Sequence, residues 1–266
     1  MIKRDSLPFA CGLLLIGVLS VGMLGGCKDS SSTAANESSG STASSPIKGT
    51  PPPAKSDKTT TASNPSLDQI PMELKTDGYE YYGLGNSATM KMELRQGSEK
   101  SGLVGTQTIT FKEMKDGAPI FTMEHGDGLA GLGSQELRVE KDGIYTVAST
   151  LAKVGAHDLE IPAKLDPGVT WKSHEEVDKD NSNTIEDDVY KVVGVQKVKT
   201  SVGQYDALLI TSAGESKTTG GNSKAISSSK IHSEGWYVKG RGLVRLTIHS
   251  TDPKGKESDL SIEEVK

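Results

Sequence analysis

An all-β fold is the class that the sequence predicts for residues 67–266, which follow a segment of different composition. Short stretches of this region alternate apolar and polar side chains, and clusters of Gly, Asp, Asn and Pro separate them at intervals of roughly 8–14 residues. No segment keeps an apolar period of about 3.6 over ten residues, so long amphipathic helices are not expected. Roughly ten to twelve short strands with Gly-rich turns are typical of an antiparallel sandwich, a barrel or a strongly curved sheet.

The predicted strands follow one another along the chain without an intervening helix. The clearest alternation lies in residues 88–94, where four apolar side chains share one face. A hairpin is predicted at Asp142-Gly143, because Asp-Gly between two alternating runs is a strong turn signal. The predicted strands are residues 88–94, 107–111, 119–124, 136–139, 144–147, 189–193, 196–200, 207–212, 235–238, 243–249 and 259–264.

The predicted strands can all belong to one domain, since about 200 residues suit a single β-rich domain. The glycine-rich segment 124–134 leaves a second possibility open, in which two halves of the domain meet there.

Residues 27–66 have the composition of a tether. Ser, Thr, Ala, Pro, Lys and Asn dominate this segment, and Ile47 is its only large aliphatic residue. Such a segment cannot bury enough apolar surface to offset the entropy of ordering. We expect a disordered linker with an end-to-end distance of roughly 35 Å, which holds a folded domain away from a membrane.

The N-terminus has the features of an export signal, residues 1–26. Lys3 and Arg4 precede an apolar stretch, residues 9–24, that is somewhat short for a spanning helix of about 20 residues. The stretch is followed directly by small residues and a cysteine. The sequence Leu24-Gly25-Gly26-Cys27 resembles the lipobox of bacterial lipoproteins. This resemblance implies cleavage before Cys27, acylation of its thiol and attachment of the protein to a membrane of the bacterial cell envelope, with the domain outside the cytoplasm. The alternative is an uncleaved membrane anchor in which Cys27 is incidental.

Composition excludes several classes of function. Cys11 and Cys27 are the only cysteines, so a lipidated mature protein has no disulfide and no catalytic thiol. The formal net charge of −5 and the aromatic content of 5% give no footprint for nucleic acid. The sequence contains no nucleophile elbow, Walker loop or dinucleotide fingerprint, and its histidines are not at metal-ligand spacing. We therefore expect no cofactor, no catalytic residue and a protein that is not an enzyme.

Three motifs in the second half resemble one family. They lie at residues 165–171, 202–207 and 236–244, and the last reads Trp-Tyr-Val-Lys-Gly-Arg-Gly-Leu-Val. The family is a group of largely uncharacterised β-rich domains of bacterial secreted proteins and lipoproteins, and the resemblance covers about residues 160–265. Lys239 and Arg241 depart from its pattern of small or apolar residues. The resemblance implies a β-rich fold and an envelope location, without catalytic residues. The motif residues are Gly168, Trp171, Gly203, Tyr205, Trp236, Tyr237, Gly240 and Gly242.

Structural roles are expected for these motif residues. Trp171, Trp236 and Tyr237 are large aromatic side chains in an aromatic-poor domain and are expected to anchor its core or to cap a barrel end. Gly240 and Gly242 suit a turn or bulge in which a positive φ is required. The alternative is that the aromatic side chains contact a ligand.

A weak metal site is suggested by an acidic segment. Asp178, Asp180, Ser182 and Thr184 follow the spacing of the opening of a calcium loop. Position twelve of that pattern is Val189, where a bidentate Glu belongs. A solvated acidic hairpin tip is the competing interpretation.

Three functions are weighed from these observations. The first is a non-catalytic envelope lipoprotein whose β-domain binds or scaffolds a partner that the sequence does not identify. The second is a carrier of lipid or other apolar molecules, with a cavity lined by a set of adaptable apolar side chains: Met90, Met92, Leu94, Ile109, Phe111 and Met123. The third is a hydrolase of wall polymers, which would need a cleft holding two acidic groups with shifted pKa values.

Replacing Cys27 by Ser is expected to abolish acylation, because the thiol that accepts the lipid is removed. Metabolic labelling with palmitate followed by membrane fractionation measures this, with the unaltered chain as control. A Cys27→Ser variant that still incorporated label would contradict the lipoprotein assignment.

Overall fold

The computed structural model describes residues 66–99, 101–155, 158–179, 182–220 and 223–266. The predicted signal, Cys27 and nearly all of the predicted tether lie outside these residues.

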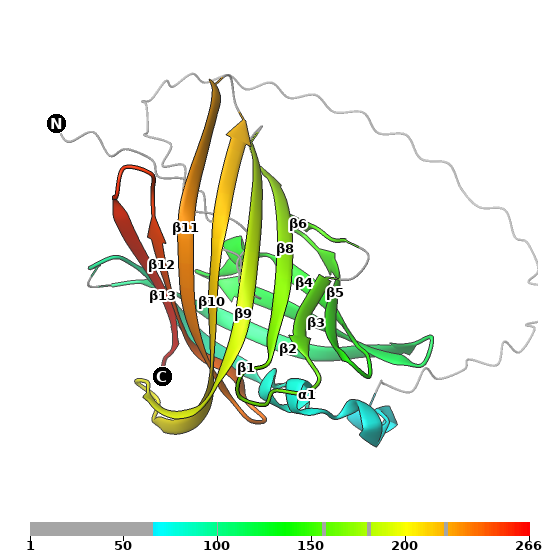
Figure 1. Ribbon diagram of the computed structural model, residues 1–266. Helices are drawn as coiled ribbons and strands as arrows, with labels where there is room; N and C mark the ends of the chain where they lie inside the picture. Colours follow the sequence, from blue (N-terminus) through cyan, green and yellow to red (C-terminus); the bar gives the residue numbers. More distant parts are fainter. Residues whose placement is uncertain (1–65, 100, 156–157, 180–181, 221–222) are drawn as a thin grey trace, which may run out of the picture. The chain divides into compact units, whose positions relative to one another are not determined.

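One antiparallel sheet accounts for most of the described chain, which confirms the all-β prediction (Figure 1). Its thirteen strands are β1 (Thr89–Gln96), β2 (Leu103–Lys115), β3 (Ala118–Asp127), β4 (Ser134–Val139), β5 (Gly143–Ser149), β6 (Ala152–Lys153), β7 (Asp158–Pro162), β8 (Thr170–Lys179), β9 (Ser182–Lys199), β10 (Gln204–Gly220), β11 (Ser223–Val238), β12 (Gly242–Thr251) and β13 (Glu257–Glu264).

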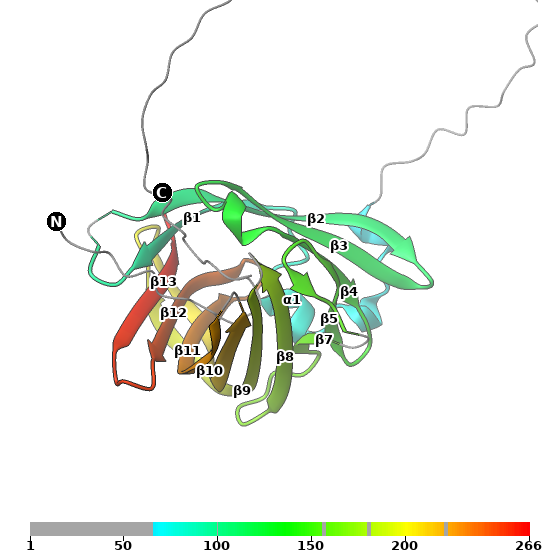
Figure 2. The same cartoon turned by 90° about the horizontal axis from the view of Figure 1, so that it is seen from above.

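The sheet is strongly curved but not closed. Its strand order is β6-β8-β9-β10-β11-β12-β13-β1-β2-β3-β4-β5-β7, so β1 pairs with β13 near the middle of the sheet. Figure 2 shows the sheet curling until β8 lies beside β7. In the described residues β7 and β8 are near neighbours that share no hydrogen-bonded register. We call the boundary between these two strands the seam.

The glycine-rich segment 124–134 does not interrupt the sheet. The 3₁₀ turn η3 (Ala130–Leu132) connects β3 to β4, and these strands pair from Ile120↔Arg138 to Glu124↔Ser134. The predicted hairpin at Asp142-Gly143 is present between β4 and β5.

Three short helical segments precede the sheet and were not predicted. They are η1 (Leu67–Gln69), η2 (Met72–Leu74) and α1 (Asp77–Tyr81). Thr76 caps α1, because its Oγ1 accepts a hydrogen bond from the Tyr79 amide at 3.4 Å. At five residues α1 is too short to produce a recognisable helical period. It packs against β5 and β12, and its Tyr79 ring meets that of Phe121 at 6.0 Å between centroids.

The six apolar side chains proposed to line a lipid cavity lie in the main hydrophobic core. Each of Met90, Met92, Leu94, Ile109, Phe111 and Met123 exposes 6% of its surface or less. Phe111 packs against Phe121 with ring centroids 5.4 Å apart.

The long strands β9, β10 and β11 exceed the predicted strands in length. The sequence predicts two strands at 189–193 and 196–200, whereas the structure has one, β9, with a bulge beside Gly194. Gly194 has a φ of +134°, a backbone conformation typical of glycine in turns. For this reason the sequence around it predicts a break between two strands. Beyond the predicted limits the inner positions are polar, as at Ser216 and Ser233, so an apolar alternation is missing there.

Trp236 and Tyr237 lie on opposite faces of β11, which corrects the expectation that both anchor the core. Tyr237 pairs with Leu243 and exposes only 1% of its surface. Trp236 pairs with Arg245, whose guanidinium lies 5.3 Å from the centroid of the indole. The half-buried indole packs against a small separate cluster of Val198, Ala207 and Val244. Alternation along a strand places adjacent side chains on opposite faces, so only one of the pair can enter the main core.

Gly242 begins β12 where the chain passes close to the segment after α1. Its φ is +93°, and a Cβ at this position would lie 2.9 Å from the Tyr82 carbonyl oxygen. Gly240, with a φ of +73°, forms the preceding turn, as expected from the sequence.

Truncating Tyr237 is expected to destabilise the domain more than truncating Trp236. Tyr237→Ala should lower the free energy of unfolding by about 3–5 kcal/mol, because it empties a fully buried site. Trp236→Ala should cost about 1–2 kcal/mol, because the indole is half-buried and loses one cation–π contact. Urea unfolding of the two variants measures the difference, and equal losses would contradict this assignment of faces.

Candidate functional site

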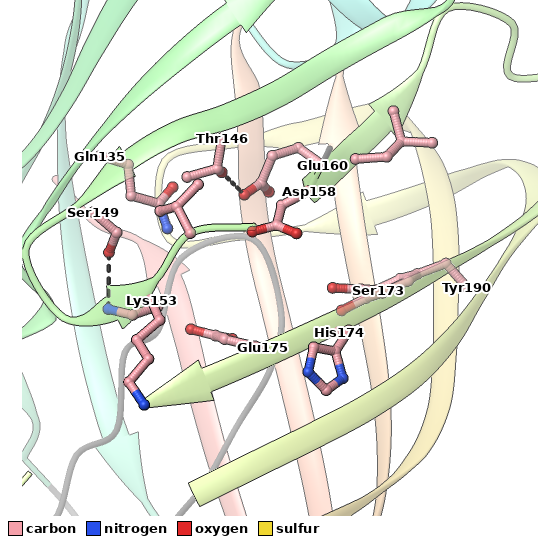
Figure 3. A pocket seen from close by; sticks show the side chains of 13 residues that line it. Gln135, Thr146, Ser149, Lys153, Asp158, Glu160, Ser173, His174, Glu175 and Tyr190 are labelled. Atoms are coloured by element: carbon pink, nitrogen blue, oxygen red, sulfur yellow. Dashed lines mark hydrogen bonds between the residues drawn. The ribbon is translucent and has the colours of Figure 1, made fainter. Parts of the chain in front are cut away.

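A small acidic pocket opens at the seam. Residues of β4, β5, β7, β8 and β9 and of the segment around β6 surround it (Figure 3). The space inside that water can reach is about 40 Å³. The charged and polar residues that line it include Gln135, Thr146, Asp158, Glu160, Ser173 and Glu175. We call it the seam pocket.

Glu160 enters the seam pocket from β7. The Thr146 hydroxyl of β5 donates a hydrogen bond to Glu160 Oε1. Burial raises the pKa of Glu160 to about 7, and the charge of Asp158 adds to this, while the Thr146 hydrogen bond opposes it.

Glu175 enters the pocket from β8, on the opposite side of the seam. It shares the inner face of its strand with Trp171 and Val177, which are buried. Burial raises the pKa of Glu175 to about 8, with further contributions from Glu160, Asp188 and Asp158. Among the described residues no hydrogen-bond donor is recorded for its carboxyl group.

Two more carboxyl groups lie on the inner face of β9. Glu186 exposes 4% of its surface and Asp188 exposes 3%. Asp188 lies opposite Gly214 of β10, where any Cβ would collide with Asp188 Oδ1. Burial raises the pKa of Asp188, a hydrogen bond with Glu186 opposes this, and the charge of Asp187 adds to it. Asp188 Oδ1 has no hydrogen-bond partner within the described part of the chain.

An aromatic pair lies on the same inner face, on β8 and β9. Trp171 of β8 stacks on Tyr190 of β9 with ring centroids 5.1 Å apart and an angle of 16° between the planes. Burial raises the pKa of Tyr190 well above its usual value, and the charges of Asp188 and Glu186 raise it further. Tyr190 therefore presents a neutral phenol to the pocket that it lines.

Basic side chains at the rim of the pocket pair with other acids. Lys153 Nζ forms ion pairs with Glu176 and, at 2.9 Å, with Asp178. His174 Nδ1 lies 2.7 Å from Asp187 Oδ1 on the outer face. The two basic side chains that line the pocket, Lys153 and His174, thus have acidic partners other than Glu160 and Glu175.

A second, more open hollow adjoins the seam pocket. Its volume is about 430 Å³, and it shares Asp158, Leu159, Ser173 and His174 with the pocket. The hollow continues along β8 and β9 past Lys172 and Val189. An extended ligand could thus reach the pocket from this side.

The residues of the predicted calcium loop lie in and around a β-hairpin. Asp178 belongs to β8 and accepts a hydrogen bond from Asn183 at 2.8 Å, while Ser182 pairs with Lys179 at the start of β9. Thr184 is buried and its hydroxyl meets that of Thr218 at 3.0 Å. Asp180 lies outside the described residues, so calcium binding stays a prediction. Within the described residues, no group of three or more His, Cys, Asp or Glu side chains is arranged to hold a metal ion.

Trp171 is the motif residue next to the pocket, because it stacks on Tyr190. Gly168, Gly203 and Tyr205 do not line the pocket. Gly168, with a φ of +92°, forms the turn before β8. Gly203 closes the turn between β9 and β10, where its carbonyl accepts a hydrogen bond from the Thr200 amide at 2.8 Å. The Tyr205 hydroxyl donates to Glu264 Oε2 at 3.2 Å, and Arg241 pairs with the same carboxylate.

The acidic residues of the pocket were not identified from the sequence. Glu175 lies in a run, His174-Glu175-Glu176, that resembles a solvated strand end. Their positions relative to apolar residues of the same strands could have identified these carboxyl groups as inward-facing. Glu175 has the same parity as Trp171 and Val177, and Glu186 and Asp188 share the parity of Tyr190.

No protein-family model matches the chain, and no curated protein matches it. Two solved structures resemble it. One is a candidate lipoprotein of Parabacteroides distasonis, 10% identical over 70% of this chain and 98% of that chain, with a TM-score of 0.45. The other is a candidate exported protein of Bacteroides fragilis with a YmcC-like fold, 10% identical over 67% of this chain and 95% of that chain, with a TM-score of 0.36. Both scores are below 0.5, so neither match assigns a ligand or an activity. None of the helices in the described residues has the length and apolar character needed to cross a membrane.

The stability of the domain is expected to fall as the pH rises from about 4.5 to about 8. The pKa of Glu175 is about 8 in the folded protein and close to 4.5 when unfolded, so the folded state binds more protons between these values. Glu175→Gln cannot ionise and should therefore flatten the profile by several degrees of Tm. Glu176→Gln is the matched control, because the hydrogen bonds from Lys153 and Asn183 lower the pKa of Glu176. Parallel profiles for wild type and Glu175→Gln would contradict the raised pKa.

Proposed function

We propose that this chain is a lipid-anchored, extracytoplasmic binding protein whose β-domain takes a cationic group into the seam pocket. The single observation that carries the proposal is the convergence of Glu160 and Glu175 on a pocket whose neighbouring basic side chains are paired elsewhere. A buried carboxylate is stable only when a positive charge or hydrogen-bond donors accompany it, so the pocket favours a cationic ligand.

The sequence supports the proposed location. Leu24-Gly25-Gly26-Cys27 has the order of a lipobox, and residues 28–65 have the composition of a tether. Two acyl chains on one residue give stable membrane attachment, whereas one chain is marginal. A domain held in this way samples ligands within a few nanometres of its membrane.

Binding of the cation is expected to release protons. At neutral pH, Glu175, with its pKa of about 8, is mostly protonated, and Glu160, with its pKa of about 7, is about half protonated. A cation in the pocket stabilises the ionised form of both groups and so lowers both pKa values. The affinity should therefore rise with pH between about 6 and 9.

Carriage of apolar molecules receives less support from the packing. The six side chains proposed as a lining belong to the main core and are almost completely buried. The seam pocket is lined by several charged and polar side chains, and a lipid tail there would leave those groups without partners.

Acid–base hydrolysis is a second candidate, because two carboxyl groups with raised pKa values face one pocket. One of them could act as an acid and the other as a base near neutral pH. Its size argues against this role, since an interior of about 40 Å³ holds about three water molecules but not a sugar ring between the two carboxyl groups. Non-catalytic binding is therefore the function that we propose.

Isothermal titration calorimetry of the full-length protein with spermidine tests the proposal. The wild type in an uncharged detergent is expected to bind at pH 8.5, and more weakly at pH 6. Glu175→Gln should weaken binding at least tenfold, and the double variant Glu160→Gln/Glu175→Gln should abolish it, because the counter-charges are removed. Glu176→Gln, on the other face of the same strand, should bind like the wild type. Binding that is unaffected by the double variant would contradict the proposal.

A further inference from the structure

We infer that the seam pocket is specific for a primary ammonium group at the end of an unbranched alkyl chain. This inference rests on the proposed function and adds to it the chemical class of the ligand. Three properties of the site carry it: the number and direction of its hydrogen-bond acceptors, its size, and the state of its aromatic side chain.

The acceptors of the pocket match the three N–H donors of a primary ammonium. Gln135 of β4, Glu160 of β7 and Glu175 of β8 surround the same space from three strands (Figure 3). Gln135 Oε1 is buried and has no hydrogen-bond partner in the described part of the chain. Three acceptor residues from three strands line one pocket, which suits an ammonium because it has three N–H donors. A guanidinium donates within one plane and prefers a fork of two parallel bonds to one carboxylate.

Further negative charge lies in the adjoining hollow, which Asp188 lines. Asp188 exposes only 3% of its surface, its Oδ1 has no partner among the described residues, and its charge acts on Glu175. Gly214 leaves space for this carboxyl group, and a larger residue there would displace it. Carboxyl groups therefore line both the seam pocket and the hollow beside it.

The size of the pocket favours a small cationic group. A water molecule needs about 10–15 Å³ of such space, so 40 Å³ accommodates an ammonium and its first methylene group. A trimethylammonium group is several times larger. The alkyl chain of the ligand would continue into the adjoining hollow, along Leu159, which lines both spaces.

The aromatic side chain of the pocket is unavailable for a cation–π contact. Recognition of quaternary ammonium groups uses exposed aromatic faces. Tyr190 exposes 2% of its surface, and Trp171 covers one face of its ring at 5.1 Å. The pocket therefore recognises a cation by hydrogen bonds and charge, which a quaternary ammonium cannot match because it has no N–H group.

Competition between simple cations tests this specificity. The full-length protein in uncharged detergent is titrated at pH 8.5 and constant ionic strength with 1,5-diaminopentane, guanidinium and tetramethylammonium. We expect the diamine to bind at least tenfold more tightly than the other two. A blocked Gly-Lys-Gly tripeptide is the fourth probe: tighter binding of the peptide supports a lysine side chain as the source of the ammonium, and tighter binding of the diamine supports a free amine.

Substitutions at two adjacent residues of β4 test the role of Gln135, with Glu136 as the control. Gln135→Leu removes the neutral acceptor and should weaken binding of the diamine about fivefold to tenfold, while Gln135→Glu should strengthen it. The adjacent Glu136 pairs with Lys112 on the other face, so Glu136→Gln should bind the diamine like the wild type. Circular dichroism at the same pH verifies that each variant is folded.

The outcomes separate this inference from the proposed function. If guanidinium or tetramethylammonium binds as tightly as the diamine, and Glu175→Gln abolishes that binding, the specificity is overturned while the cation-binding function stands. If Gln135→Leu and Glu136→Gln bind the diamine alike, the three-acceptor geometry is overturned. If neither spermidine nor any probe of this panel binds the wild type, both the function and the specificity are overturned.

Discussion

The seam between β7 and β8 is the constraint on which the candidate site depends. These strands are near neighbours, yet in the described residues no ladder of hydrogen bonds joins them. Paired strands lie about 4.8 Å apart, a spacing that leaves no room between their backbones for a ligand. Glu160 and Glu175 enter the seam from opposite sides, and their mutual repulsion opposes closure whenever both are ionised. The carboxyl groups in the seam thus help to keep β7 and β8 unpaired, and the sheet stays open there.

The inner face of the sheet divides into an apolar and a polar part. Under β1 to β5 it is filled by residues such as Met92, Phe121 and Met123, which supply the hydrophobic core. Under β8 to β11 it carries core residues such as Tyr190 and Ile210, but also Glu186, Asp188 and several serines. Burying carboxyl groups there weakens the fold because they must give up hydration or their charge. Such groups contribute little to stability unless paired, and their retention is consistent with a role in recognition.

Much of the fold could be predicted from the sequence, and little of the site. Alternation at residues 88–94 and the Asp142-Gly143 turn correspond to β1 and to the β4–β5 hairpin, because apolar period and turn chemistry are local properties. Strand β8 escaped notice because its sequence, Trp-Lys-Ser-His-Glu-Glu-Val-Asp-Lys, places a carboxyl group at an inner position where an apolar residue is expected. The pocket depends on β7 meeting β8 around the curve of the whole sheet, which no local pattern encodes. The same limit applies to Trp236, whose face depends on the register of β11 with β12.

The pairing of β1 with β13 has a consequence for the order of assembly. Met92 lies opposite Glu264, so the first strand of the sheet has its neighbour on one side only when the last strand has been made. A sheet joined in this way has contacts of the greatest possible sequence separation at its centre, and such topologies fold slowly. A chain that is threaded through a membrane from its N-terminus benefits from this delay, since the sheet cannot be completed before the C-terminal strand has crossed.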